Sequence, residues 1–178
     1  LGEKHPATLA SLNNLAETYR VLGRYAEALP LHEKALRLKT EVLGERHPTT
    51  LSSLYNLALT YVAFGRPTEA RQLYERLVTG VEQLRTSGEL SPVNRQALFA
   101  QWVEAYKRYA ELLIAQGNTA RGFDLAELSK ARTLLESTAT RRANEAGILS
   151  PADRAQVREM ETRLAQFDEK IASAFNLP

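Results

Sequence analysis

The sequence contains no cysteine among its 178 residues. A disulfide, a thiolate nucleophile and a cysteine-bound metal are therefore excluded. This composition is typical of a reducing compartment, and we expect a cytoplasmic location. The formal net charge is only +2, so electrostatics alone give no reason to expect a nucleic-acid partner.

Long apolar runs and catalytic motifs are also missing. No stretch approaches the roughly 18 apolar residues of a membrane span, and nothing resembles a signal peptide. GxGxxG, GxSxG, HExxH and the P-loop do not occur, the carboxylates are scattered, and there are only 3 histidines. We therefore expect a chain that is not an enzyme, binds no cofactor or metal, and makes no membrane contact.

An internal repeat is the main feature that the sequence does contain. LGEKHPATL at residues 1–9 returns as LGERHPTTL at residues 43–51, and residues 1–42 are identical to residues 43–84 at 20 of 42 positions. A fixed period of this size indicates a repeat architecture. Because the chain begins at Leu1, in the middle of a repeat, we expect it to be a fragment of a longer protein.

Apolar residues recur within each repeat at helical spacing. In the first repeat they are Leu9, Leu12, Leu15, Ala16, Tyr19 and Leu22, then Ala28, Leu31, Ala35, Leu38 and Val42. Gly23 and Gly65 fall where a helix must end and the chain reverse, a place that favours a left-handed backbone. The proline after each repeated histidine suits a first helical turn. Each repeat is therefore predicted to be two antiparallel helices.

This arrangement resembles the tetratricopeptide family, whose usual unit follows W-x2-L-G-x2-Y, then A-x3-F, then P. The pattern positions are occupied by Leu12, Leu15, Ala16, Tyr19, Ala28 and His32 in the first repeat, and by Leu54, Leu57, Ala58, Tyr61, Ala70 and Tyr74 in the second. The terminal proline is missing. The longer unit, with LNNLA and GRYAEA, looks like the repeat of kinesin light chains and their bacterial relatives. The resemblance covers residues 1–84 and implies a solenoid of helical hairpins.

The repeated histidines suggest a metal or acid–base site. Such a site needs ligands that converge on one point, whereas helical repeats place equivalent residues about one repeat apart. We interpret His5 and His47 as loop residues that precede a helix-starting proline. His32 stands where the family pattern has an aromatic residue, and we interpret it as a packing residue.

Beyond residue 84 the repeat becomes divergent. A serine and a proline at 91–92 predict the start of a helix that ends at Gly117. Its apolar residues at helical spacing are Phe99, Trp102, Tyr106, Tyr109 and Leu113. After Asn118 a long helix follows, in which Gly122 takes the place of Ala28. This region is predicted to be a third helix pair.

A last helix is predicted after the Ser-Pro pair at 150–151. Its apolar residues are Val157, Met160, Leu164, Phe167, Ile171 and Ala174, which form a seam with a seven-residue period. The nearest partner for this seam is the long helix before it, through Leu128, Ala131, Leu135 and Thr138. We interpret the last helix as amphipathic and closing the array, with coiled-coil dimerisation as the alternative. Apolar residues such as Phe167 and Phe175 favour this end as the one that meets a partner.

The expected fold is all-α, a tetratricopeptide-type solenoid of about three helix pairs plus a C-terminal amphipathic helix. Seven helices are predicted near residues 6–22, 25–43, 48–64, 67–87, 92–116, 119–146 and 151–175. The expected divisions are two repeats at 1–84, the divergent pair at 85–146, and a C-terminal helix at 151–178 that leads to a missing downstream domain.

The stretch DLAELSKARTLLE carries a second resemblance. It is similar to the helical segment that precedes the CHAT domain, a caspase-like cysteine peptidase fold, in bacterial tetratricopeptide proteins. The resemblance covers about residues 92–175. It implies that this chain is the sensing or docking arm of a larger peptidase, with a caspase-like domain downstream. No catalytic residue of that domain is carried over, because the chain ends at Pro178 and has no cysteine.

A protein-binding surface is predicted on the first helix of each pair, which in this family lines the concave face. The candidate peptide-binding residues are Asn13, Asn14, Glu17, Tyr55, Asn56, Lys107 and Arg108. A primary amide both donates and accepts, so a row of asparagines can hold an extended peptide backbone. Lys107 and Arg108 suit an acidic side chain or a C-terminal carboxylate. The resemblance to kinesin light chains, which bind short and often acidic peptides in this way, implies the same.

Alternatives stay open at this point. Asn14 and Asn56 could instead bridge neighbouring helices, and Lys107 and Arg108 could form an ordinary solvated face. Nucleic acid is a less favoured partner, because no aromatic residues accompany the arginines of the long helix. The chain could also be a structural or oligomerisation element. The expectation is a non-catalytic module that binds a peptide or protein partner, with the oligomeric state not predicted.

Overall fold

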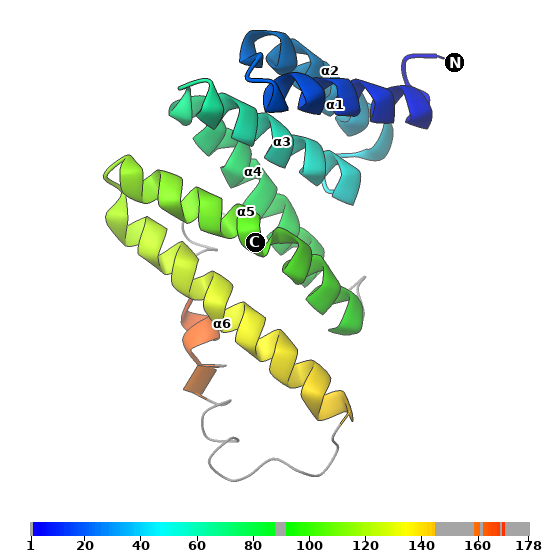
Figure 1. The fold of residues 1–178 in the computed structure, drawn as a ribbon. Helices are drawn as coiled ribbons and strands as arrows, with labels where there is room; N and C mark the ends of the chain where they lie inside the picture. The colour runs from blue at the N-terminus through cyan, green and yellow to red at the C-terminus, as the bar shows by residue number, and fades with distance from the viewer. Residues whose placement is uncertain (1, 88–91, 145–158, 161, 168, 170–178) are drawn as a thin grey trace. The chain divides into compact units, whose positions relative to one another are not determined.

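The computed structural model describes residues 2–87, 92–144, 159–160, 162–167 and 169. Its helices are α1 (Pro6–Val21), α2 (Tyr25–Leu43), α3 (Pro48–Ala63), α4 (Pro67–Thr86), α5 (Pro92–Ala115) and α6 (Thr119–Asn144), as Figure 1 shows. All six begin at the predicted residue. Of the predicted helix 151–175, the described residues are helical and the others lie outside the described part. The chain divides into two compact units, Leu1–Leu84 and Arg85–Pro178.

Three helices end in the same glycine turn. Gly23, Gly65 and Gly117 have φ values of 73°, 75° and 81°, the left-handed region that glycine adopts without strain. At Gly65 the glycine N–H donates to the carbonyl of Val62 at 3.1 Å, and the next N–H donates to the carbonyl of Tyr61 at 2.8 Å. These are the two hydrogen bonds of a Schellman motif, which satisfies the last carbonyls of a helix. The predicted reversals are therefore confirmed.

A three-residue clamp follows the glycine in both repeats of the first unit. The Arg66 guanidinium lies 4.9 Å from the centre of the Tyr61 ring and pairs with Glu69 at 2.6 Å. In the first repeat Arg24 makes the same two contacts, with Tyr19 at 4.5 Å and with Glu27. Each clamp therefore joins the end of one helix to the start of the next.

The loop before each repeat is also held in an equivalent way. Glu3 pairs with Lys34 at 2.6 Å, and 42 residues later Glu45 pairs with Arg76 at 2.7 Å. Both pairs join the loop to the second helix of the same repeat. They are largely exposed, so each contributes little to stability.

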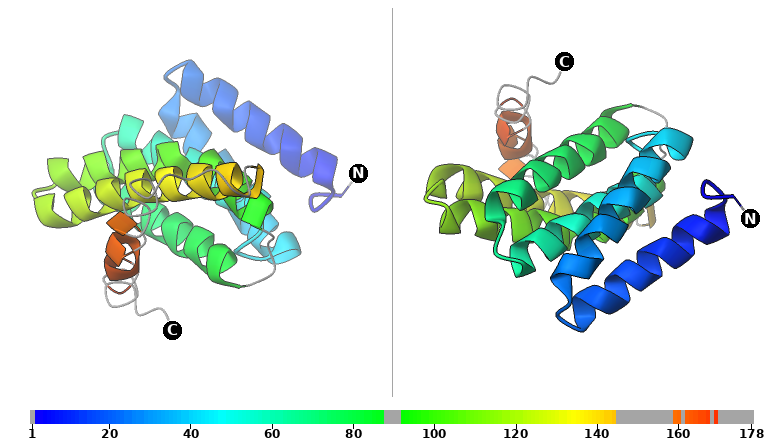
Figure 2. Two further views of the ribbon diagram at one scale, coloured as in Figure 1. Left: turned by 90° about the horizontal axis from the view of Figure 1, so that it is seen from below. Right: turned by 90° about the horizontal axis from the view of Figure 1, so that it is seen from above.

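The core of the first unit is built from small residues at the pattern positions and leucines around them. Ala16, Ala28, Ala58 and Ala70 are fully buried, which lets paired helices approach closely. Leucines and other apolar residues complete this core: Leu9, Leu29, Leu36, Leu38, Leu51, Leu54, Leu57, Leu73, Leu77, Val78 and Val81. Figure 2 shows the four helices of this unit as two successive hairpins.

Helices α2 and α3 share one buried polar contact. The Lys39 ammonium donates to the Ser53 hydroxyl at 2.9 Å, and burial lowers the pKa of Lys39. Ser53 in turn donates to the carbonyl of Thr49 at 3.3 Å. The contact links the second helix of one repeat to the first helix of the next.

The second unit is a hairpin of α5 and α6, which pack along each other (Figure 1). The aromatic and aliphatic residues predicted for its core, Phe99, Trp102, Tyr106, Tyr109 and Leu113, are all buried. Gly122 is required where the helices meet, because a Cβ there would lie 2.9 Å from the carbonyl oxygen of Ala110.

The C-terminal helical residues lie against α6 within the second unit. Met160 and Phe167 line a cavity of about 290 Å³ together with Ala131 and Leu134 of α6. At its edge Arg163 lies 3.7 Å from Glu127. Met160 and Phe167, two residues of the predicted seam, therefore face the long helix. Val157, Ile171 and Ala174 lie outside the described residues. Phe175 lies outside the described residues.

We expect Gly65→Ala to lower the free energy of unfolding by about 1 kcal/mol, because a side chain at a positive φ strains the backbone. Nothing lies within 4 Å of the added Cβ, so no clash contributes. Urea unfolding followed by circular dichroism measures the change. Gly2→Ala is the control, since that glycine also faces open space and has no positive φ. Equal effects of the two substitutions would contradict the role of the turn.

Candidate protein-interaction surface

Two of the predicted asparagines meet on neighbouring helices. The Asn56 amide of α3 donates to the Asn13 side-chain oxygen of α1 at 3.5 Å, and both residues are half-buried. This distance is long for a hydrogen bond, so the contact is weak. Each amide keeps further donor and acceptor capacity that this contact does not use.

A charged pair extends the polar surface along α1. Arg20 donates two hydrogen bonds to the Glu17 carboxylate, at 2.6 and 2.8 Å, and both side chains are only partly exposed. Hydrogen bonding from Arg20 lowers the pKa of Glu17, and the same contact raises the pKa of Arg20. Arg20 was not among the predicted residues. Its position three residues after Glu17 was the available signal.

The remaining predicted residues of the first unit differ in exposure. Tyr55 is half-buried, and its ring meets the edge of Tyr74 on α4 at a centroid distance of 6.2 Å. Asn14 is exposed, although it is equivalent to Asn56 by the 42-residue period. Asn56 therefore contacts Asn13 and not Asn14, its own equivalent in the first repeat.

Lys107 and Arg108 belong to the second unit and lie on α5. Both are exposed. Arg108 donates to the Glu104 carboxylate at 2.8 Å, one helical turn earlier. A ligand carboxylate would therefore have to compete with Glu104 for this guanidinium.

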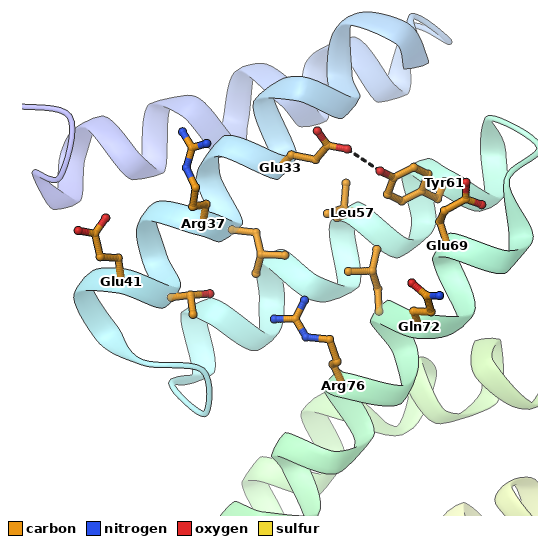
Figure 3. A pocket seen from close by; sticks show the side chains of 11 residues that line it. Glu33, Arg37, Glu41, Leu57, Tyr61, Glu69, Gln72 and Arg76 are labelled. Carbon is orange, nitrogen blue, oxygen red and sulfur yellow. Dashed lines mark hydrogen bonds between the residues drawn. The ribbon is translucent and has the colours of Figure 1, made fainter. Parts of the chain in front are cut away.

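A groove lies on a different face of α3 (Figure 3). It measures about 520 Å³, within the usual range of ligand pockets. Its lining residues are Glu33, Leu36, Arg37, Thr40 and Glu41 of α2, Leu57 and Tyr61 of α3, and Glu69, Gln72, Leu73 and Arg76 of α4. This groove was not predicted from the sequence, because its lining residues come from three helices and not from the outward faces of the first helices alone.

One interaction in the groove joins two helices. The Tyr61 hydroxyl of α3 donates to the Glu33 carboxylate of α2, as Figure 3 shows. Burial raises the pKa of Tyr61 to about 12, and the bond to Glu33 adds to the shift. The hydroxyl therefore keeps its proton and remains a donor.

The two repeated histidines are helix caps. Nδ1 of His5 accepts from the N–H of Ala7 at 3.2 Å, and Nδ1 of His47 accepts from the N–H of Thr49 at 3.2 Å. In each case the histidine precedes the first-turn proline. Among the described residues, no group of three or more histidines, aspartates or glutamates is placed to hold a metal ion. The structural interpretation of His5 and His47 is confirmed.

The comparison with protein families connects this geometry to known proteins. Residues 7–83 match the model of the tetratricopeptide repeat. This match covers most of the first unit and less than half of the chain. Hairpins of this kind create extended binding surfaces and are generally used for protein–protein interaction. No curated protein matches the chain.

Two solved structures are similar to this chain. A single-substitution variant of Podosopora anserina "kinesin light chain nearly identical TPR-like repeats" is 24% identical and covers 100% of this chain and 81% of its own, with a TM-score of 0.56. A second structure with the same description is 25% identical and covers 96% of this chain and 79% of its own, with a TM-score of 0.47. The first likeness supports an all-α array of tetratricopeptide type. The resemblance of residues 92–175 to the segment before CHAT domains stays a prediction.

In the described part of the chain, no helix combines the length and the apolar character that crossing a membrane requires.

His32 occupies the aromatic position of the tetratricopeptide pattern, where the second repeat has Tyr74. It is fully buried, and neither ring nitrogen has a hydrogen-bond partner. Burial lowers the pKa of His32 from 6.5 to about 4; Glu17 opposes this shift, and Arg20 and Lys39 add to it. The imidazole is therefore a neutral packing group, as the sequence predicted.

We expect His47→Ala to lower the free energy of unfolding by about 1 kcal/mol, because α3 loses a cap on one of its first N–H groups. His47→Asn should retain most of the stability, since an asparagine side chain accepts the same bond. Thermal and urea unfolding measure both variants. If the two lose the same stability, the ring nitrogen is not what matters at this position.

We expect the wild-type protein to lose stability as the pH falls from 6.5 toward 4, by up to about 3 kcal/mol, because unfolded His32 binds a proton more tightly than folded His32. Above pH 6.5 this contribution is fully present. His32→Phe should remove this part of the pH dependence while keeping the core filled. Urea unfolding at neutral and acidic pH tests it, with His5→Asn as the control. If His32→Phe kept the pH dependence of the wild-type protein, the assignment to His32 would be contradicted.

Proposed function

We propose that the chain is a non-catalytic protein-interaction module that holds a short extended segment of a partner protein across α1 and α3. The binding residues would be Asn13, Asn14, Glu17, Tyr55 and Asn56 in the first unit, with Lys107 and Arg108 as a separate basic site in the second. The amide contact between Asn13 and Asn56 carries this proposal. Two half-buried amides on neighbouring helices, with hydrogen-bonding capacity to spare, suit a peptide backbone.

The surroundings of the amide pair support the same use. Tyr55 offers a half-buried ring with a polar tip, a combination enriched at interfaces. Glu17 and Arg20 lie one helical turn and two turns from Asn13 and are already paired with each other. The pair can orient a polar partner without leaving an isolated charge on the surface. An acidic partner would be favoured by Lys107 and Arg108, which are exposed and positively charged on α5.

We expect the Asn13→Ala/Asn56→Ala double variant to bind a selected peptide about tenfold more weakly, since each lost hydrogen bond contributes about 1 kcal/mol or less. The peptide would come from a library of short segments rich in acidic side chains and free C-terminal carboxylates, and affinity would be measured by calorimetry. Gln116→Ala, which removes an exposed amide in the second unit, is the matched control.

Asn14→Ala separates the two ways in which the asparagines could work. If the contacting pair binds the peptide, this exposed residue contributes less than Asn13. If Asn14 and Asn56 form a row repeated every 42 residues, both matter equally. Unchanged affinity in the double variant, with helicity intact, would place the peptide elsewhere. Loss of thermal stability without any peptide binding would leave the asparagines as a bridge between helices.

A further inference from the structure

The groove of Figure 3 is a second surface, distinct from the amide pair. Asn56 and Leu57 are consecutive on α3, so their side chains point about 100° apart around the helix. Asn56 turns toward α1, whereas Leu57 lines the groove between α2 and α4. The two surfaces could therefore be occupied by different ligands.

The floor of the groove is aliphatic. Leu36, Leu57 and Leu73 come from three different helices, line the groove and are buried. Ionisable side chains of α2 and α4 stand on the two banks, as Figure 3 shows for Glu33, Arg37 and Glu69. A ligand would therefore place apolar groups on the floor and a polar or charged group at a bank.

Most charged side chains on the α2 and α4 sides of the groove already form an ion pair. Arg76 pairs with Glu45, Glu41 with Lys4, and Glu69 with Arg66. These partners all lie outside the groove lining.

Glu33 is different from the other carboxylates of the groove. It accepts a hydrogen bond from the Tyr61 hydroxyl, which brings no positive charge. Within the part of the chain that the structure describes, Glu33 forms no ion pair with Arg37, which lies one turn further along α2 and points away from it in Figure 3.

The end of the groove around Tyr61 consequently carries excess negative charge. Glu33 accepts a hydrogen bond from the Tyr61 hydroxyl, and Glu33 and Glu69 both act on that hydroxyl electrostatically. The Arg66 guanidinium lies over the Tyr61 ring. It forms an ion pair with Glu69 and also interacts electrostatically with Glu33. Two carboxylates with one cation leave a site that attracts a second cation.

The first repeat shows which part of this arrangement is special. Tyr19, Arg24 and Glu27 form the same clamp there as Tyr61, Arg66 and Glu69. What the second repeat adds is Glu33, contributed by the preceding hairpin. The excess carboxylate therefore arises where two hairpins meet, beside the aliphatic floor.

We propose that this groove binds a short peptide of a partner protein in which a lysine or arginine stands next to aliphatic residues. The basic side chain lies near Glu33 and Glu69. The aliphatic side chains pack on Leu36, Leu57 and Leu73. The aliphatic stem of a lysine or arginine can cover part of the floor while its charged end stays at the rim. Nucleic acid does not fit this site, because its phosphates would meet three glutamates against two arginines.

The test uses the full 178-residue chain and an array of blocked octapeptides. Each peptide carries one lysine or arginine next to two or three leucine, isoleucine or valine residues. Matched arrays carry glutamate or glutamine in place of the base. We expect the basic array to bind best, with binding that weakens as salt is added. Amide shifts in NMR spectra should map the best peptide to residues 33–41 of α2 and 69–76 of α4.

Two substitutions test the carboxylates directly. Glu33→Gln keeps an acceptor for Tyr61 but removes the charge, so the fold is retained while affinity falls about twofold to fivefold, the effect of a partly exposed ion pair. Glu69→Gln should have a similar effect. Glu27→Gln is the matched control, because Glu27 pairs with Arg24 as Glu69 does with Arg66 but lies outside the groove lining.

Several outcomes would overturn the proposal. Equal binding of the glutamate array would show that charge does not select the ligand, and equal effects of Glu33→Gln and Glu27→Gln would remove Glu33 from the site. Concentration-dependent mass in sedimentation that Glu33→Gln abolishes would make the occupant a second copy of the chain. The Asn13→Ala/Asn56→Ala variant should bind the basic peptide normally, so the two surfaces can fail independently.

Discussion

The glycine turn between paired helices is the constraint on which the first unit depends. Gly23 and Gly65 each take a left-handed backbone and close their helix with the same pair of hydrogen bonds. The next residue is then an arginine at a fixed place, where it stacks on a tyrosine of the helix that has ended and pairs with a glutamate of the helix that begins. Because the turn fixes where the second helix starts, it also fixes which residues of that helix are buried.

Helix α3 has a double role that follows from the stacking of hairpins. Its fully buried alanine, Ala58, belongs to the core, while Asn56 reaches α1 and Tyr61 reaches α2. Both of these contacts cross from one repeat to the other. One candidate binding surface forms around each of these contacts, since a helix between two neighbours presents a separate face to each.

Polar residues in this chain are used mainly to shape the fold. His5 and His47 complete the hydrogen bonding of helix starts, and His32 fills a core position as a neutral ring. The buried ammonium of Lys39 joins neighbouring repeats through Ser53. Residue types that often mark catalysis therefore have sufficient structural reasons to be present here. Glu33 differs, because the hydrogen bond that it accepts from Tyr61 brings no positive charge and it shares Arg66 with Glu69.

The sequence alone determined the helices, their first residues and their pairing, because proline, glycine and apolar spacing act through local backbone geometry. It also identified His32 as a packing residue and the aromatic core from Phe99 to Leu113. It could not decide that Asn56 meets Asn13 rather than lining up with Asn14, that Arg20 holds Glu17, or that Glu33 crosses to Tyr61. Those contacts depend on the angle and offset at which neighbouring helices pack, and a repeat period identifies equivalent positions without specifying what lies beside them. Only the tertiary structure sets these lateral neighbours, and with them the groove.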